Sequence, residues 1–235
     1  MKNIAIIPAR GGSKRIPRKN IKPFMGKPII AYSIEAALHS GLFDEVMVST
    51  DDEEIAAIAR QYGASVPFYR SAEMSNDYAT TADVIEEVLD IYKENGQIFD
   101  NVCCLYATAP FVTSHRLKDA FEMMINKEYN SVYPIVLFSY PVQRGLNLED
   151  GKIGMVWPEH LNTRSQDLPP IYHDAGQFYV STAQSFYSVR SFLTNNTGGL
   201  ILSELEVQDL DTEIDWKLAE MKYQLLRADN EENLF

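Results

Sequence analysis

Residues 4–20 constrain the fold of this chain more than any other stretch of its sequence. The stretch opens with the apolar run Ile4–Ile7 and then breaks at two adjacent glycines, Gly11 and Gly12. A short apolar run of this kind is typical of a strand that is buried on both faces of a parallel sheet. Paired glycines let a backbone take left-handed angles and approach a ligand closely. The stretch therefore predicts an α/β fold whose first strand leads into an open binding loop.

The loop also concentrates positive charge. No acidic residue occurs before Glu35, whereas six cationic residues lie in or just after the loop: Arg10, Lys14, Arg15, Arg18, Lys19 and Lys22. Arginine and lysine side chains match phosphate oxygens, and bare glycine N–H groups suit an anion. A simple turn or a solvated basic surface is the alternative, but the strand, the glycines and the cations together favour a triphosphate site. The Walker and dinucleotide-binding glycine spacings are both absent, so the loop is of another type.

The bulk composition limits the function classes. The chain has 235 residues, which predicts one domain, 1–235. Its net charge of −12 argues against nucleic acid or an anionic membrane as a partner. No apolar run approaches the length of a membrane span, and the first run is too short for a signal peptide. The adjacent Cys103 and Cys104 would point to opposite faces of a strand, which predicts free buried thiols and a cytoplasmic protein.

Apolar runs alternate with helical patterns along the chain. After the first loop we expect helices and strands in this order: helix 28–40, strand 45–49, a helix ending near Gly63, a helix starting at Thr80 or Thr81, strand 101–106, helix 114–126 and strand 131–136. This order predicts right-handed crossovers and a parallel sheet. Residues 66–68 are expected to form a short edge strand, because Pro67 cannot donate to a ladder.

The acidic pair Asp51 and Asp52 admits two interpretations. The two carboxylates resemble a metal pair. However, Thr50-Asp51-Asp52-Glu53 also resembles a capping box at the start of a helix, and this explanation accounts for both residues. We therefore favour the capping interpretation.

A second acidic pair lies near the end of the chain. Asp209 and Asp211 alternate around Leu210, so on a strand they would share one face. Carboxylates on one face repel each other unless a cation lies between them, and hard oxygen ligands suit Mg²⁺. The alternative is that Asp211 or Thr212 caps a helix from about residue 213 to residue 226. The polar residues after Arg227 are expected to fray.

Residues 8–20, followed by Gly26-Lys-Pro28, resemble the signature of the sugar-acid cytidylyltransferases, the CMP-sialic acid synthetases and their relatives. The likeness covers nearly the whole chain, and it is closest to the members that activate pseudaminic acid. It implies a three-layer Rossmann-like nucleotidyltransferase fold with a mostly parallel mixed sheet. It also implies an enzyme that joins CTP and a nonulosonic acid to give a CMP-sugar and pyrophosphate, with Mg²⁺ as cofactor. The alternatives are a synthetase for N-acetylneuraminic, legionaminic or KDO sugar acids, or a non-catalytic nucleotide-binding protein.

The resemblance also implies roles for individual residues. Nucleotide contacts are expected from the first loop and from the segment before the third helix: Ala9, Arg10, Gly11, Gly12, Ser13, Lys14, Lys19, Asn20, Arg70, Thr80 and Thr81. Asp209 and Asp211 match the metal-binding pair of the family. The expected catalytic set consists of three loop cations and one of these carboxylates: Arg10, Lys14, Lys19 and Asp211.

Sugar contacts and an arm follow from the same resemblance. Tyr106 stands where sialic acid synthetases commonly have a sugar-binding Gln, which favours a differently decorated sugar. Residues 138–174, with a hairpin at Asp150-Gly151, resemble the protruding dimerisation arm of the family, which implies a homodimer. The candidate sugar or partner contacts are Tyr106, Thr108, Arg164, Gln166, His173 and Gln177. For His173, a hydrogen-bonded structural role is the alternative.

Overall fold

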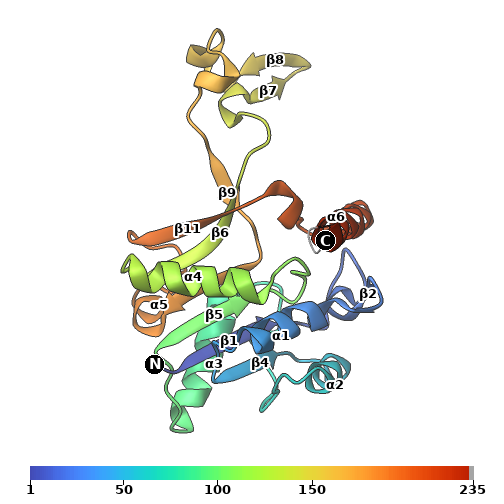
Figure 1. Ribbon diagram of the computed structural model, residues 1–235, viewed down its shortest axis with the longest axis vertical. Helices are drawn as coiled ribbons and strands as arrows, with labels where there is room; N and C mark the ends of the chain where they lie inside the picture. The colour runs from blue at the N-terminus through green and yellow to red at the C-terminus, as the bar shows by residue number, and fades with distance from the viewer. Residues whose placement is uncertain (233–235) are drawn as a thin grey trace.

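A seven-stranded mixed sheet forms the centre of the molecule (Figure 1). The computed structural model describes residues 1–232, with side chains as far as residue 228. The strand order is β11-β6-β10-β5-β1-β4, and β9 pairs with a further stretch of β6. The strands are β1 Asn3–Pro8, β4 Glu45–Ser49, β5 Asn101–Leu105, β6 Ser131–Leu137, β9 Tyr172–Asp174, β10 Phe178–Thr182 and β11 Thr197–Leu202. β1 runs parallel to β4 and β5, whereas β10 is antiparallel to β5 and β6, which confirms the predicted mixed sheet.

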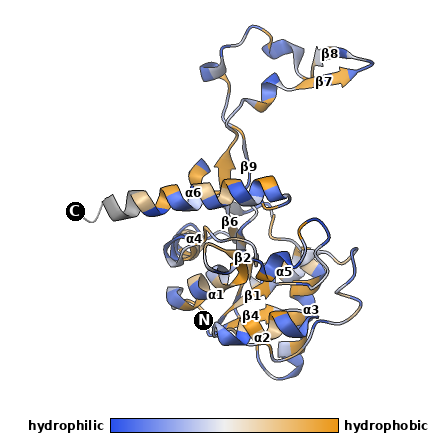
Figure 2. Ribbon diagram, turned by 90° about the vertical axis from the view of Figure 1, so that its right-hand side faces the viewer, coloured by the Kyte–Doolittle hydropathy of each residue, from blue (hydrophilic) through white to orange (hydrophobic). Residues whose placement is uncertain are grey.

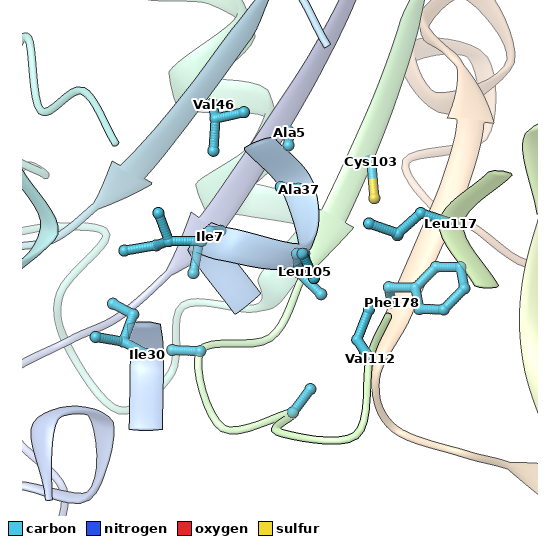
Figure 3. Packing of buried hydrophobic residues seen from close by; sticks show 14 of the residues in the cluster. Ala5, Ile7, Ile30, Ala37, Val46, Cys103, Leu105, Val112, Leu117 and Phe178 are labelled. Atoms are coloured by element: carbon cyan, nitrogen blue, oxygen red, sulfur yellow. The ribbon is translucent and has the colours of Figure 1, made fainter. Parts of the chain in front are cut away.

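Helices cover both faces of the sheet. The helices are α1 Ile29–Ser40, α2 Glu53–Gln61, α3 Thr81–Glu94, α4 Ser114–Asn126 and α5 Ala183–Val189. Ala5 and Ile7 of β1 pack with α1, α2 and α4 (Figure 3), whereas Ile4 and Ile6 pack with α3 and α5. Successive side chains of a strand point to opposite faces, so the unbroken apolar run of β1 supplies both cores. The result is the predicted three-layer fold.

The two cysteines lie side by side on β5 but belong to different cores. Cys103 packs on the α1 and α4 face, and Cys104 packs on the α3 face. Both are free thiols with no exposed surface, as the sequence predicted. Burial raises the pKa of each thiol, because a thiolate would lose its solvation there. Both side chains therefore behave as small apolar core residues.

A third apolar cluster joins the C-terminal helix α6, Glu213–Glu232, to the first loop. Ile16 and Leu210 are each 1% exposed, and they pack with Phe24 and Trp216. Phe24 belongs to a small hairpin formed by β2 Pro23–Phe24 and β3 Lys27–Pro28, and its ring contacts the Trp216 ring edge-on. This cluster brings residues 209–211 beside the loop that follows β1. α6 continues past its predicted end at residue 226, so the fraying predicted after Arg227 is wrong for residues 228–232, which are helical. For residues 233–235 that prediction lies outside the described part of the chain.

The residues between β6 and β9 project from the body as a long arm (Figures 1 and 2). The arm carries a hairpin of β7 Leu146–Glu149 and β8 Lys152–Met155, turning through Asp150 and Gly151 at positive φ as predicted. At its base, β9 pairs antiparallel with β6, with Tyr172 opposite Leu137. The two chain segments that lead into the arm are therefore tied to each other at the sheet.

Two local predictions are wrong. Residues 66–68 form no strand: only Ser65 bridges to Met47, and Pro67 has no N–H with which to extend the ladder. Residues 208–211 make no strand pairing, and residue 211 lies in a bend, so Asp209 and Asp211 are not placed by a pleat. Within residues 1–232, no helix combines the length and apolar character needed to cross a membrane.

Candidate active site

A cavity of about 570 Å³ opens at the carboxyl ends of β1 and β5. Ligands of open α/β sheets sit at this edge, where the strand order changes direction. Two short segments, the loop after β1 and residues 70–81, line most of it, together with the residues after β5. The predicted site residues in its lining are Arg10, Ser13, Lys14, Lys19, Asn20, Arg70, Thr80, Thr81, Tyr106 and Thr108. We call it the basic cavity.

Only some of the loop cations face the basic cavity. Arg10, Lys14, Arg15 and Lys19 line it. Arg18 instead pairs with Asp52 and Glu54, which holds the pKa of Asp52 down at about 2. Lys22 pairs with Glu213 at 2.7 Å and lies 4.5 Å from the centre of the Trp216 ring. The outward-facing cations thus fasten the loop to α2 and α6, and the inward-facing ones border the space that a ligand would occupy.

The glycines shape the loop from behind the cavity wall. The Gly11 N–H donates to Asp51 at 2.9 Å, so it is not available to an anion. A Cβ at Gly11 would lie 2.7 Å from an oxygen of Asp52, so only glycine fits this approach. Ala9 is buried and Gly12 lies outside the lining, so these predicted nucleotide contacts are not brought into the cavity.

The Asp51–Asp52 pair has a structural role, as the capping interpretation held. The Asp52 carboxylate accepts from the backbone N–H groups of Glu54 and Ile55, and it is the N-cap of α2. The cap residue is Asp52 rather than Thr50, whose hydroxyl accepts from the Asp52 N–H instead. The predicted N-cap was therefore two residues too early along the chain, and the cap is the single side chain of Asp52.

The basic loop and the second acidic pair meet, as the sequence led us to expect. Lys19 Nζ donates to the Leu210 carbonyl at 2.7 Å and lies 3.9 Å from Asp211 Oδ1. Arg15 contacts the other oxygen of Asp211 at 2.5 Å. Burial lowers the pKa of Lys19, while the nearby carboxylates of Asp211 and Asp209 oppose that shift. The burial of Leu210 in the third apolar cluster supports this contact between distant parts of the chain.

The carboxylates of Asp209 and Asp211 are oxygen ligands of the chemical kind that binds Mg²⁺. Thr212, not Asp211, caps α6: its hydroxyl accepts from the Asp215 N–H, and the Asp215 carboxylate accepts from the Thr212 N–H. Asp211 is therefore not needed as a cap. No group of three or more potential ligands clusters within the described residues. Mg²⁺ is commonly bound by one or two carboxylates together with substrate phosphates, and that mode suits Asp209 and Asp211.

Asp77 is a member of this site that sequence reasoning missed. Its carboxylate accepts from Arg10 at 2.9 Å and from Lys14, and its pKa is lowered, first by the bond from Lys14. The neighbouring Asn76 carbonyl also accepts from Arg10, at 3.2 Å. One carboxylate thus holds two cations that were assigned to the triphosphate. The only signal in the sequence was an acidic residue in the polar loop before Thr80.

Arg70 and the start of α3 complete the basic cavity. Arg70 is only 8% exposed, and its Nε donates to Ser49 Oγ at 3.0 Å. No ion pair involves Arg70 among the residues described, and burial lowers its pKa. Thr80 caps α3 through a capping box with Asp83, which directs the helix N-terminus at the cavity. A buried, fixed guanidinium beside a helix N-terminus is suited to an anion.

A second cavity of about 340 Å³ adjoins the first and shares Thr80, Thr81 and Tyr106 with it. We call it the aromatic cavity because its walls carry four rings: Tyr106, Tyr133, Tyr179 and Phe192. The Tyr106 and Tyr179 rings meet edge-on at 5.5 Å, and the Tyr106 hydroxyl lies 3.4 Å from that of Thr81. Asp174 and Arg190 also line this cavity. Sequence reasoning identified only Tyr106 and the two threonines.

Four predicted sugar contacts lie outside both cavities. Gln177 is 4% exposed and donates to the Glu206 carbonyl, so it is part of the core. His173 packs against the Phe138 ring at 4.7 Å, and its Nδ1 lies 2.8 Å from the Asp174 carbonyl, which fits the structural alternative. Arg164 and Gln166 lie in the arm, where Arg164 pairs with Asp167. The arm projects from the body (Figure 1), and neither Arg164 nor Gln166 lines either cavity.

Fold and site together define a nucleotide-binding α/β enzyme. It has a cation-lined cavity at the carboxyl edge of the sheet, and Asp211, which is outside the lining, contacts two of the cations. The chain matches the cytidylyltransferase family over residues 4–227, and it belongs to that family. It is thus a nucleotidyltransferase, in agreement with the resemblance noted in the sequence.

Individual members of the family and related solved structures are similar to this chain over nearly its whole length. The chain is 45% identical to a pseudaminic acid cytidylyltransferase of Campylobacter jejuni, over 96% of this chain and 97% of that one. It is 38% identical to the CMP-N,N'-diacetyllegionaminic acid synthase of Legionella pneumophila, over 96% and 97% of the two chains. Among solved structures, a CMP:2-keto-3-deoxy-manno-octonic acid synthetase complexed with CTP has the same fold, with a TM-score of 0.69, 19% identity and coverage of 97% and 100%.

Proposed function

We propose that this enzyme joins CTP and pseudaminic acid to give CMP-pseudaminic acid and pyrophosphate. The observation that carries the proposal is the meeting of Lys19 and Asp211 beside the basic cavity, with the aromatic cavity next to it. One cavity suits a triphosphate and the other suits a sugar. The relative that is 45% identical over nearly its whole length is named for the same substrate.

In the proposed reaction, the anomeric hydroxyl of the sugar attacks the α-phosphorus of CTP. An oxygen–phosphorus bond forms, the bond to pyrophosphate breaks in line with it, and the proton of the hydroxyl is released to water. Arg10, Lys14 and Lys19 bind the triphosphate, and Arg70 at the start of α3 holds a further part of the nucleotide. Such a transfer needs positioning and charge neutralisation more than covalent help from the protein. Mg²⁺, held by Asp209 and Asp211, would supply further neutralisation of phosphate charge.

We further propose that the enzyme is a homodimer joined through the arm. Leu146, Leu148, Ile153 and Leu161 of the arm are between 59% and 72% exposed, which is unusual for large apolar side chains gathered on a small projection. Figure 2 shows the apolar character of β7 in this arm. Arg164 and Gln166 are then free to approach the site of the partner subunit. Buried free thiols favour a reducing cytoplasm as its location, with a cell-surface glycan as the destination of the sugar.

A pyrophosphate-release assay tests the reaction. CTP, UTP, ATP and GTP are each combined with pseudaminic, legionaminic, N-acetylneuraminic and KDO acids in the presence of Mg²⁺. We expect the highest kcat/KM with CTP and pseudaminic acid. A higher value with another sugar acid would replace the proposed substrate but keep the reaction. CTP binding without turnover on any sugar acid would instead indicate a non-catalytic nucleotide-binding protein.

A further inference from the structure

The aromatic cavity contains one carboxylate, that of Asp174 at the end of β9. Its Oδ2 accepts from the Tyr179 hydroxyl at 2.8 Å, and its Oδ1 accepts from the Gly176 N–H at 2.7 Å. Gly176 has a φ of 63°, so the turn after β9 fixes the carboxylate from behind. An ionised carboxylate offers about four acceptor positions, and the protein occupies two of them. Asp174 therefore has acceptor capacity left for a ligand.

The one cation of the aromatic cavity does not offset this charge. Arg190 pairs with Asp83 at 2.8 Å and with Glu86 at 2.6 Å, both on α3. Two carboxylates thus balance one guanidinium, and Asp174 faces the cavity without a cation of its own among the residues described. A negatively charged pocket repels a ligand carboxylate and attracts hydrogen-bond donors. The acid group of a sugar acid accordingly belongs on the side of the basic cavity.

This distribution of charge orients the sugar. In a nonulosonic acid, the carboxylate and the attacking hydroxyl share the anomeric carbon. If that carbon lies at the border with the basic cavity, near Tyr106 and Thr81, the opposite end of the sugar enters the aromatic cavity. That end bears acylamino N–H and hydroxyl groups, which are donors. The three tyrosines and Phe192 offer apolar surface to the methyl groups of acyl substituents.

We propose that Asp174 is a specificity-determining residue that accepts a hydrogen bond from an N–H or O–H at the end of the sugar remote from the anomeric carbon. This inference rests on the proposed function. Asp174 is exposed in the free protein and is covered only when a sugar fills the aromatic cavity. A sugar that covers this carboxylate without donating to it leaves a desolvated acceptor unpaired, so one such group can select among sugar acids. The same carboxylate would reject a sugar with a second acidic group at this end.

The test compares Asp174→Ala with the wild-type protein. We expect the KM for the sugar acid to rise about tenfold or more while the KM for CTP changes less than about twofold. A set of deoxy analogues, each lacking one N–H or O–H, locates the contact. For one analogue, the wild type should show a higher KM than for the full sugar acid, and the variant should show no such difference. The proposal would be overturned if the KM for the sugar acid is unchanged in the variant. It would also be overturned if every analogue raises the KM of the variant as much as it raises the KM of the wild type.

Two further variants separate recognition from support of Tyr179. Tyr179→Phe also removes the hydrogen bond from the tyrosine hydroxyl to Asp174, but it keeps the carboxylate. This variant should therefore still show a raised KM for the analogue that lacks the group bound by Asp174. If Tyr179→Phe shows no raised KM for that analogue, Asp174 acts only by holding the tyrosine, and the proposal fails. Asp90→Ala is the matched control, because Asp90 accepts from the Tyr187 hydroxyl at 2.9 Å but lines neither cavity. Asp174→Leu replaces the alanine variant if that variant does not fold, because leucine is of similar size and has no acceptor.

Failure of the inference can be told apart from failure of the proposed function. Sugar binding is measured by calorimetry in the presence of CTP without Mg²⁺, for wild type and for the Asp174 variant. Wild-type protein that binds the sugar acid but releases no pyrophosphate on adding Mg²⁺ would contradict the proposed reaction alone. Equal sugar affinity in the two proteins would contradict the role of Asp174 alone.

Discussion

At the scale of single residues, the basic cavity is held together by bonds that a nucleotide has to replace. Asp77 occupies Arg10 and Lys14, and Asp211 occupies Arg15. Each of these carboxylates thus pairs with cations that could bind a phosphate instead. The site is thus preassembled by internal ion pairs, and binding exchanges one anion for another without leaving the cations unpaired.

We expect Asp77→Asn to lower the KM for CTP by about two- to fivefold, the range expected from exposed ion pairs. The substitution keeps the size of the side chain and removes the charge that competes with phosphate. Steady-state kinetics at saturating sugar measures the effect, with Asp150→Asn at the arm hairpin as control. A raised KM would mean that Asp77 assists nucleotide binding.

Asp211→Ala tests the metal assignment. Its kcat/KM should fall by about a hundredfold or more, and the residual rate should respond less to added Mg²⁺, because one of two carboxylate ligands is lost. Titration of Mg²⁺ in both proteins measures this, and a circular dichroism spectrum shows whether the fold is kept. Glu213→Gln removes a neighbouring carboxylate that pairs with Lys22, and should retain the wild-type magnesium response. Full activity of Asp211→Ala at all Mg²⁺ concentrations would show that Asp211 is not a ligand.

The sequence predicted the chemistry of the first loop better than the direction of each side chain. Six cations close together favoured a phosphate site whichever of them took part. Arg18 and Lys22 face outward because Asp52 and Glu213 lie close enough to pair with them, and those partners are 34 and 191 residues away in the chain. Asp77 was missed for the same reason, since only the folded chain brings it to Arg10 and Lys14.

At the scale of elements, the start of α2 links the loop to the sheet. Asp52 caps this helix and pairs with Arg18, and its pKa in the folded protein is about 2, against 3.8 for a free side chain. Because the folded pKa is the lower one, Asp52 stabilises the fold above about pH 4. This contribution is lost as the pH falls through 2, where the carboxylate is protonated in both states.

Asp52→Asn should therefore lower the free energy of unfolding by about 1–2 kcal/mol at pH 7, with a smaller difference at pH 3. The asparagine can still cap the helix, so the loss reports mainly on the pairing with Arg18. Urea unfolding at pH 7, 4 and 3 measures both proteins. A difference that stays constant over this range would show that the charge of Asp52 is not responsible.

Elements with a clear period were predictable, and sites assembled from several elements were not. The helix that Thr80 caps was found because its apolar residues repeat with the helical period, and the strands around Ile4 and Cys103 were found because each is an unbroken apolar run. The aromatic cavity draws on β6, β9, β10 and the segment after α5. No local pattern in the sequence connects Tyr133 with Asp174 or Phe192. The strand expected at residues 66–68 failed because a neighbouring strand, not local propensity, decides pairing at a sheet edge.

At the scale of the whole molecule, the arm is the part most easily separated from the enzyme body. Its two connections lie next to each other, because the Phe138 N–H donates to the Ile171 carbonyl at 3.1 Å and Leu137 pairs with Tyr172. The body keeps its own sheet and cores without the arm. We therefore expect the arm to govern assembly and the body to govern folding and nucleotide binding.

Replacing residues 139–170 by Asn-Gly should close β6 and β9 into a plain hairpin. We expect this protein to be a monomer by size-exclusion chromatography with light scattering, while its affinity for CTP stays within about threefold of the wild type, since no arm residue lines the basic cavity. The unaltered protein should run as a dimer in the same measurement. A dimer that persists without the arm would place the interface on the body.

The burial of both sulfur atoms on β5 has a practical consequence. Cys103 and Cys104 are the only cysteines of the chain, and neither has exposed surface. A cysteine introduced at Lys152, at the exposed tip of the arm, would therefore be the single thiol open to a maleimide dye. Fluorescence from such a label would test for the subunit exchange that the proposed homodimer implies.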